Sequence, residues 1–282
     1  MKMMGRFLGS AFLSLLLAVA AFAQEVPPDR VSVPFSDPSR PGVLKVHLLN
    51  GGITIKGYEG KEAVVEARTR IGRRGRSERS PDEGAGAGGM RRILNTATGL
   101  TVEEENNVIS VGVGSFNRTM DLTIQVPFGT SLKLSSVNDG DIKVEKIRGD
   151  IEVNNTNGGI VMTGISGSVV AYALNGNVVV AFDEVTPNKA MSFSSMNGKI
   201  DVTLPASVKA KVSLKSDNGD IYSDFEIQMD PSAGRTVAED GRGKGGKYVV
   251  RVDKTMHGTI NGGGPEFQFK NFNGNIYIRK KS

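Results

Sequence analysis

The sequence has no cysteine among its 282 residues. That absence excludes disulfide bonds, catalysis by a thiolate and lipid attachment at a cysteine next to a cleavage site. Histidine is scarce too: His47 and His257 lie far apart without a neighbouring cluster of ligands, so we predict no zinc site. No Gly-x-Ser-x-Gly motif stands between an expected strand and an expected helix, which removes the usual sign of a serine hydrolase. We therefore predict no catalytic, cofactor-binding or metal-binding residues.

Long apolar runs are confined to the N-terminus, where residues 12–20 are apolar or small and Ala21 and Ala23 follow. A basic start, an apolar core and a small-residue cleavage site are typical of a secretory signal peptide, so we predict that residues 1–23 are removed. The alternative is an uncleaved membrane anchor, although the run is shorter than the ~20 residues that span a bilayer. We expect an exported protein, either periplasmic, in the cell envelope or secreted, with no transmembrane segment after cleavage.

Positive charge is also modest. Removal of Lys2 and Arg6 with the signal peptide lowers the formal net charge from +5 to +3. Much of the remaining positive charge stands in the arginine- and glycine-rich segment 72–92, not along an expected helix or an aromatic platform. Nucleic acids are recognised through such basic faces, so we predict no nucleic-acid partner.

Glycine, in contrast, is abundant, and five glycines recur at a spacing of nine residues: Gly140, Gly149, Gly158, Gly167 and Gly176. Apolar residues stand two and four positions after each of them: Ile142 and Val144, Ile151 and Val153, Ile160 and Met162, Val169 and Ala171, Val178 and Val180. Apolar residues at every second position predict strands with one buried face.

Asparagine or aspartate precedes every second glycine of the repeat, so the full period is eighteen residues. These residues are Asp139, Asn157 and Asn175, and the later copies add Asn197, Asn218 and Asn273. Asn and Gly enter left-handed backbone conformations at little cost and turn the chain sharply. We interpret them as structural turns whose amides stack in a ladder, not as a binding site.

These features predict an all-β, single-domain β-solenoid, similar to a right-handed parallel β-helix, with coils of ~18–22 residues and strands or hairpins at its N-terminal end. Later coils are predicted at Gly198, Gly219 and Gly274 and a degenerate copy at Gly258, whereas the early Asn50-Gly51 copy is equally compatible with a simple hairpin.

The domain organisation follows from the same pattern. Residues 24–41 contain five prolines and are predicted to form a linker or a leading strand. Residues 42–282 are predicted to form the solenoid domain. Two glycine-rich segments within it, 72–92 and 230–246, are predicted to be flexible loops.

The run Val126-Pro127-Phe128-Gly129, with residues 132–142 and the repeated Asn-Gly-x-Ile/Val copies, resembles a widespread family of exported bacterial β-strand-repeat proteins. Members of that family carry an adhesin label and have no established function. The resemblance covers roughly residues 40–280 and is strongest over 120–225. It implies a β-helix-like solenoid outside the cytoplasm with no established catalytic residues.

We therefore predict a non-enzymatic structural or interaction protein of the cell envelope, with glycans, envelope components or surface proteins as partners. A polysaccharide lyase or hydrolase is the main alternative, and it requires convergent carboxylates, often with a basic residue. The available acids are Asp139, Asp141, Asp150, Glu152, Asp201 and Asp220. Asp141 and Asp220 are expected at equivalent corners several coils apart, and Asp139 and Asp141 in a hydrated turn.

A further alternative is a polymer-forming scaffold, because a solenoid with uncapped ends can add another molecule at its open edge. The last expected strand, Ile276-Tyr277-Ile278, is followed by the basic residues 279–281. Those charges are expected to discourage growth at this edge, which favours a monomer or a small oligomer.

Overall fold

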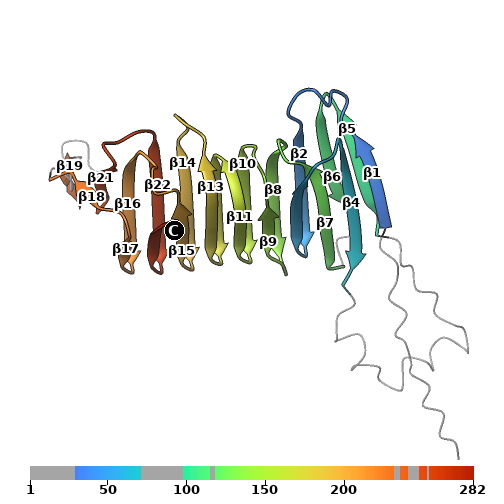
Figure 1. Ribbon diagram of the computed structural model, residues 1–282. Helices are drawn as coiled ribbons and strands as arrows, with labels where there is room; N and C mark the ends of the chain where they lie inside the picture. Colours follow the sequence, from blue (N-terminus) through green and yellow to red (C-terminus); the bar gives the residue numbers. More distant parts are fainter. Residues whose placement is uncertain (1–28, 71–97, 115–117, 232–235, 241–247, 253) are drawn as a thin grey trace, which may run out of the picture.

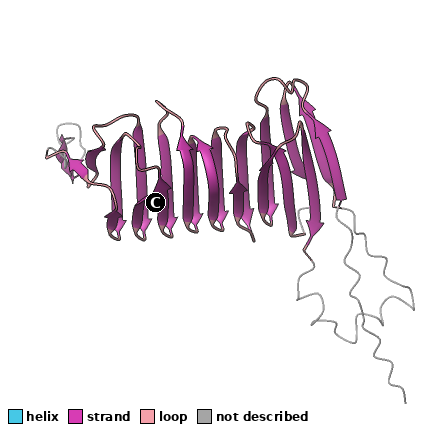
Figure 2. Cartoon of the chain, in the orientation of Figure 1, coloured by secondary structure: helices cyan, strands magenta, loops and turns pink. Residues whose placement is uncertain are grey.

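The computed structural model describes residues 29–70, 98–114, 118–231, 236–240, 248–252 and 254–282. All regular structure in these residues is β-strand (Figure 2). Two long sheets form an extended stack in which the strands lie across the long axis (Figure 1). This confirms the all-β class and a fold similar to a β-solenoid. The predicted signal peptide, 1–23, and the whole of the segment 72–92 lie outside the described residues.

The first sheet has ten strands. In spatial order they are β1 (Asp29–Pro34), β4 (Glu62–Thr69), β7 (Met120–Pro127), β3 (Ile53–Tyr58), β9 (Ile142–Glu145), β11 (Ile160–Gly167), β13 (Val178–Val185), β15 (Ile200–Leu204), β23 (Ile276–Lys280) and β17 (Ile221–Ser223).

The second sheet has eleven strands. In spatial order they are β18 (Ile227–Met229), β21 (Met256–Ile260), β16 (Ala210–Asn218), β22 (Glu266–Asn273), β14 (Met191–Asn197), β12 (Val169–Asn175), β10 (Ile151–Asn157), β8 (Ser131–Asn138), β2 (Val43–Asn50), β6 (Val108–Val113) and β5 (Leu100–Glu105). A separate antiparallel pair is formed by β19 (Thr236–Asp240) and β20 (Tyr248–Val252).

One coil consists of a strand in the eleven-stranded sheet, a sharp corner and a strand in the ten-stranded sheet. Neighbouring coils pair in parallel, so that Ile151 faces Val169 and Ile160 faces Val178. The alternate apolar residues of both sheets meet between them and are buried, as the repeat predicts. Phenylalanines fill part of this interior, and the rings of Phe193 and Phe269 stack with centroids 5.2 Å apart.

The coils do not stack in sequence order. The C-terminal coil, β22 and β23, lies between the coils β14–β15 and β16–β17, and red β22 separates β14 from orange β16 in Figure 1. At the other end, β2 and β3 are inserted between β6–β7 and β8–β9. The basic residues 279–281, at the end of β23, therefore do not protect the end of the sheet, contrary to our prediction, because β17 occupies that edge.

The corner glycines form a column in which each glycine packs against the peptide of the coil before it. A Cβ added to Gly158 would lie 2.1 Å from the carbonyl oxygen of Gly140, and one on Gly176 would lie 2.1 Å from that of Gly158. Only some of these glycines have a left-handed backbone, such as Gly198 with φ +152°. Our explanation by left-handed turns was therefore wrong for Gly158, where close approach of two coils requires glycine.

The predicted amide ladder is present at the same corner. Each asparagine donates from Nδ2 to Oδ1 of its neighbour at 2.8–3.3 Å, in the order Asn218, Asn273, Asn197, Asn175, Asn157, Asn138 and Asn50. Asn138 takes the place predicted for Asp139, which is an additional residue with φ 62°. Asn50 belongs to the ladder, so the Asn50-Gly51 copy is a coil corner and not a simple hairpin.

For the segment 24–41 the second of the two predicted alternatives, a leading strand, holds: β1 pairs antiparallel with β4 and ends at Pro34, a position that an edge strand tolerates. Two other segments differ from our predictions. The loop 230–246 contains β19, whose partner is β20. The degenerate copy at Gly258 is not a corner, because Gly258 lies inside β21 and faces Val212 of β16 in an antiparallel pair.

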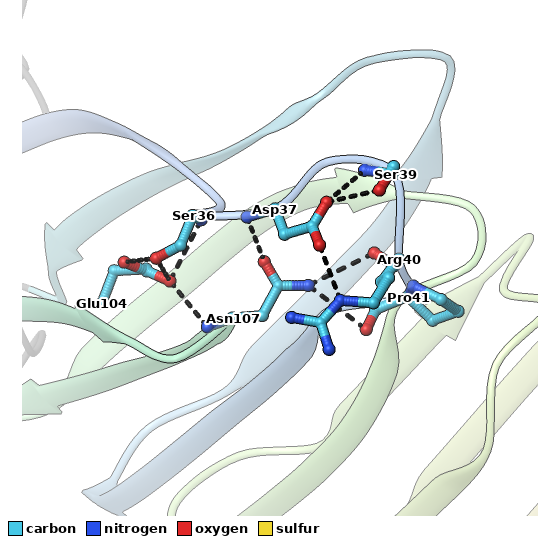
Figure 3. Close-up of polar contacts among 7 residues, drawn as sticks. All are labelled: Ser36, Asp37, Ser39, Arg40, Pro41, Glu104 and Asn107. Atoms are coloured by element: carbon cyan, nitrogen blue, oxygen red, sulfur yellow. Dashed lines mark hydrogen bonds and ion pairs between the residues drawn. The ribbon is translucent and has the colours of Figure 1, made fainter.

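At the N-terminal end, the side chain of Asn107, in the turn between β5 and β6, forms hydrogen bonds with the loop between β1 and β2 (Figure 3). Its Oδ1 accepts the backbone N–H of Asp37 at 2.8 Å, and its Nδ2 donates to the carbonyl oxygens of Arg40 and Pro41 at 3.2 and 3.4 Å. Asn107 is buried and has φ 67°. It therefore satisfies three backbone groups from a backbone conformation that few residues adopt.

Replacing Asn107 with alanine is expected to lower the free energy of unfolding by about 2–3 kcal/mol, because both the amide bonds and the tolerance for a left-handed backbone are lost. Asn106, exposed and with φ 54°, provides the matched control. Asn106→Ala should cost only about 1 kcal/mol. Urea unfolding of both variants measures the difference, and equal losses would show that the amide contacts contribute nothing.

Asp201 of β15 is a charged residue that the ten-stranded sheet largely buries, with 9% of its surface exposed. Burial raises the pKa of its carboxyl group, but hydrogen bonds from Arg279 at 2.7 Å and Lys199 at 3.2 Å outweigh that effect. The pKa of Asp201 is therefore held below its ordinary value. The charged form is stabilised in the folded chain relative to the unfolded chain.

Asp201→Asn is expected to lower the free energy of unfolding by about 2 kcal/mol at pH 7. The ion pair contributes fully above about pH 4, the ordinary pKa of an aspartate, and its contribution disappears as the pH falls through the lower folded-state pKa. The parent and the variant should therefore converge below pH 4. Asp183→Asn, which removes an exposed partner of Lys281, is the control and should change stability by less than about 0.5 kcal/mol.

Candidate functional site

Acidic side chains gather at the corner where β4 ends and β7 begins. Arg70 contacts the carboxylate of Asp121, with Nε 2.9 Å from Oδ2, and its Nη1 donates to the carbonyl oxygen of Asp139 at 2.7 Å. The hydrogen bond with Asp121 raises the pKa of Arg70. Asp139 and Asp141 line an open cavity of 570 Å³ here, together with Arg70. Arg70 thus pairs with the carboxylate of Asp121, whereas its contact with Asp139 is to the backbone carbonyl oxygen and not to the carboxylate.

The carboxylates at this corner accept hydrogen bonds from the backbone of the next coil. Asp121 accepts from the N–H of Gly52 at 3.0 Å, and Asp141 accepts from the N–H of Gly159 at 2.7 Å. The same bond recurs from Lys199 to Asn177 and from Asp220 to Asn275. An amide oxygen thus replaces the carboxylate in other coils, which indicates a structural role for these acids.

The predicted acids are otherwise dispersed. Asp141 and Asp220 occupy equivalent corners several coils apart, as expected, and Asn275 also lies between them. Asp150 binds Lys189, with Oδ2 2.6 Å from Nζ, and this hydrogen bond lowers the pKa of Asp150. Among the described residues, no group of three or more His, Cys, Asp or Glu side chains is arranged to hold a metal ion.

The broadest candidate surface is the outer face of the eleven-stranded sheet. A groove of 340 Å³ crosses its N-terminal half and is lined by polar side chains of β2, β6, β8 and β10. His47, one of the two histidines, lies in it beside Ser135. Lys133 and Glu152 form an exposed ion pair there at 3.5 Å. Paired, exposed charges of this kind contribute little to stability and remain accessible to a partner.

An apolar row follows the groove toward the corner of the same sheet. The row consists of the residues directly before six of the seven ladder asparagines: Leu49, Val137, Thr156, Leu174, Met196 and Phe272. Asp217 stands before the seventh, Asn218, and ends the row. The residues on either side of each row position are paired between neighbouring strands. Ser195 pairs with Asn271 and Asn197 with Asn273, so Met196 and Phe272 lie side by side. Met196 is 42% exposed and Phe272 46%.

The apolar row crosses six neighbouring strands, which at a spacing of ~4.8 Å gives a length of about 24 Å. Val170 and Tyr172 of β12 extend the exposed apolar surface on the same face. This row was not among the sites predicted from the sequence. The signal was available, because the position before a ladder asparagine is apolar in all coils but those of Thr156 and Asp217, yet it lies outside the pattern that begins at the glycine.

None of the described residues forms a helix that is long and apolar enough to cross a membrane.

Comparison with known proteins finds three solved structures of low similarity and one family that is similar to part of the chain. No curated protein matches significantly. A "putative cell adhesion protein" from Clostridium sporogenes ATCC 15579 shares 14% identity over 90% of this chain and 100% of its own, with a TM-score of 0.41. A "putative adhesin" from Bacteroides fragilis NCTC 9343 shares 10% identity over 90% and 97%, with a TM-score of 0.30.

A "putative lipid binding protein" from Parabacteroides distasonis ATCC 8503 shares 9% identity over 91% of this chain and 97% of its own, with a TM-score of 0.29. The family match covers the regular coils from the corner of β8 to the end of β21. Over residues 138–261 the chain is similar to the Toastrack DUF4097 family.

Proposed function

We propose that this chain is an exported, non-enzymatic protein of the cell envelope with an adhesin-like role, which binds a protein partner along the outer face of its eleven-stranded sheet. The apolar row is the observation that supports this proposal. Aliphatic side chains, a methionine and a phenylalanine offer contact area without hydrogen bonds, which suits a protein surface better than a glycan.

The arrangement of the row strengthens the proposal. Single exposed apolar residues are common on proteins, but a contiguous apolar row bordered by polar residues marks interaction surfaces. In this row Leu49, Met196 and Phe272 are exposed, and the other three residues are half-buried. Here the asparagine ladder borders one side and polar side chains such as Ser194 and Lys270 border the other. The row is also straight, since it follows strands in register, so an extended partner segment can contact several coils at once.

Several finer features belong to the same proposal. The coils are right-handed and contain about 18–22 residues. Residues 1–23 are removed on export, and the domain extends from β1 to residue 282, because β1 pairs with β4 in the ten-stranded sheet. The protein is a monomer or a small oligomer that needs no cofactor. A polysaccharide lyase or hydrolase remains the alternative, and release of unsaturated or reducing oligosaccharides from polysaccharides would support it.

The proposal is tested by binding of the purified exported protein to the isolated envelope fraction of the source bacterium. Met196→Asp places a charge in the row beside Phe272, and Ser194→Asp places the same charge on the same strand outside the row. Both positions face outward, so both variants should retain stability within about 1 kcal/mol. We expect Met196→Asp to bind about tenfold more weakly and Ser194→Asp to bind like the parent.

Treatment of the envelope fraction separates the classes of partner. Digestion with a protease should abolish binding, whereas periodate oxidation of glycans should leave it intact. Equal binding by the parent and Met196→Asp would contradict the role of the row. Binding that is lost after periodate but not after protease would assign the face to a glycan.

A further inference from the structure

The outer face of the ten-stranded sheet ends in a pair of tyrosines. Tyr222 of β17 and Tyr277 of β23 stack with ring centroids 5.2 Å apart and an interplanar angle of 10°. Among the described residues β17 is the last strand of this sheet, so one face of Tyr222 covers Tyr277 and the other is turned away from the sheet. Tyr222 is 49% exposed, the most exposed large apolar or aromatic residue of the described chain.

Hydrogen-bonding groups surround this ring pair. The hydroxyl of Tyr222 donates to Oδ2 of Asp220 at 3.3 Å, and Nδ2 of Asn275 donates to the hydroxyl of Tyr277 at 3.1 Å. The charge of Asp220 raises the pKa of Tyr222, which keeps the phenol protonated at neutral pH. The exposed ring of Tyr222 is therefore bordered by the carboxylate of Asp220, which can accept hydrogen bonds.

The cations of the C-terminal strand are already engaged. The guanidinium of Arg279 lies 5.2 Å from the ring centroid of Tyr277 and binds Asp201. Lys281 binds Asp183 at 2.7 Å, and Lys280 lies over the ring of Phe225. A cluster whose cations are paired with carboxylates or rings favours a neutral ligand over an anionic one.

We propose that Tyr222, supported by Tyr277 and bordered by Asp220, is a platform for one neutral pyranose ring of an oligosaccharide. The C–H face of a pyranose packs on an aromatic ring, while its hydroxyl groups donate to a neighbouring carboxylate. Cross-strand stacking on Tyr277 stabilises the sheet through one face of the Tyr222 ring. The other face has no role in that stacking and is available to a ligand. This site lies on the other sheet from the apolar row and does not depend on the function proposed for that row.

The platform is tested by titrating the purified protein with chitotetraose, cellotetraose and maltotetraose. The chain has five tyrosines and no tryptophan, so tyrosine fluorescence includes these two rings without a tryptophan background, and calorimetry gives the affinity. We expect at least one of the three to bind. Tyr222→Ala should weaken binding at least about tenfold, and Tyr222→Phe, which keeps the ring, by no more than about threefold.

Two controls keep the result interpretable. Tyr172→Ala removes an exposed tyrosine from the opposite sheet and should not change the affinity. Asp220→Ala should weaken binding several-fold, and it replaces Tyr222→Ala as the decisive variant if the latter unfolds. Failure of all three oligosaccharides to bind, or unchanged affinity in Tyr222→Ala, would overturn the proposal. Self-association that depends on Tyr222 without sugar binding would instead assign this edge to a second protein chain.

Discussion

Replacing Gly158 with alanine is expected to lower the free energy of unfolding by about 3 kcal/mol, and replacing it with valine to prevent folding of the regular coils. The added Cβ would lie 2.1 Å from the carbonyl oxygen of Gly140 and 2.8 Å from Nδ2 of Asn155. Contacts of about 3.5 Å are normal, so the two coils would have to separate by more than 1 Å. That separation also weakens the hydrogen bonds of the neighbouring asparagine ladder.

The adjacent Gly159 is the matched control. A Cβ at this position would lie 3.4 Å from Oδ1 of Asp141, which is an ordinary contact. Gly159→Ala should therefore change stability by less than about 1 kcal/mol. For a domain of this size the melting temperature of Gly158→Ala should fall by about 6–12 °C. Similar melting temperatures for both alanine variants would contradict the close packing of glycine against the preceding coil.

Phe269→Ala is expected to lower the free energy of unfolding by about 3–5 kcal/mol, because it leaves a cavity between the two sheets. Phe269 is fully buried and stacks on Phe193 of the neighbouring strand β14. The loss is expected to be large because β22 lies in the interior of the stack, with β14 on one side and β16 on the other. Chemical unfolding monitored by circular dichroism measures it.

Phe272 is the matched control for Phe269. It lies three residues after Phe269 on the same strand and is exposed on the outer face. Phe272→Ala removes the same ring and should cost less than about 0.5 kcal/mol. If both substitutions destabilise the protein equally, then β22 does not have the orientation described here. The variant also shortens the apolar row, so it should bind the envelope fraction more weakly while remaining folded.

The regular coils could be predicted from sequence because their spacing is constant. From Gly140 to Gly176 each glycine, strand and asparagine recurs without an insertion, and one period suffices to place the buried and exposed faces. The reason for the glycines was harder to infer. A left-handed turn and a close approach of two backbones both require glycine, and only the stacked coils distinguish them at Gly158.

The order of the coils could not be predicted. Each coil presents the same apolar rows and the same asparagine corner, so every coil edge accepts every other one equally well. Nothing in residues 266–280 indicates that they lie between β15 and β17. The contacts of Arg70 could not be predicted for the same reason. Arg70 and Asp121 lie near Asp139 only because β4 and β7 are placed beside the inserted β3.

Cysteine cross-linking tests the stacking of the coils most directly, and the absence of native cysteine leaves no background. Ser194 of β14 is paired with Lys270 of β22, and Lys270 with Lys215 of β16, all on the outer face. Ser194 and Lys270 are thus one strand apart, ~4.8 Å, whereas Ser194 and Lys215 are two strands apart, ~9.6 Å. A disulfide forms only when the Cα atoms lie within about 7 Å.

The measurement is the yield of disulfide after mild oxidation of two double variants, determined by mass spectrometry. Ser194→Cys with Lys270→Cys should cross-link efficiently, and Ser194→Cys with Lys215→Cys should remain reduced. The opposite outcome would place β14 directly against β16, as in a solenoid that stacks in sequence order. It would contradict the inserted C-terminal coil, and with it the continuous apolar row.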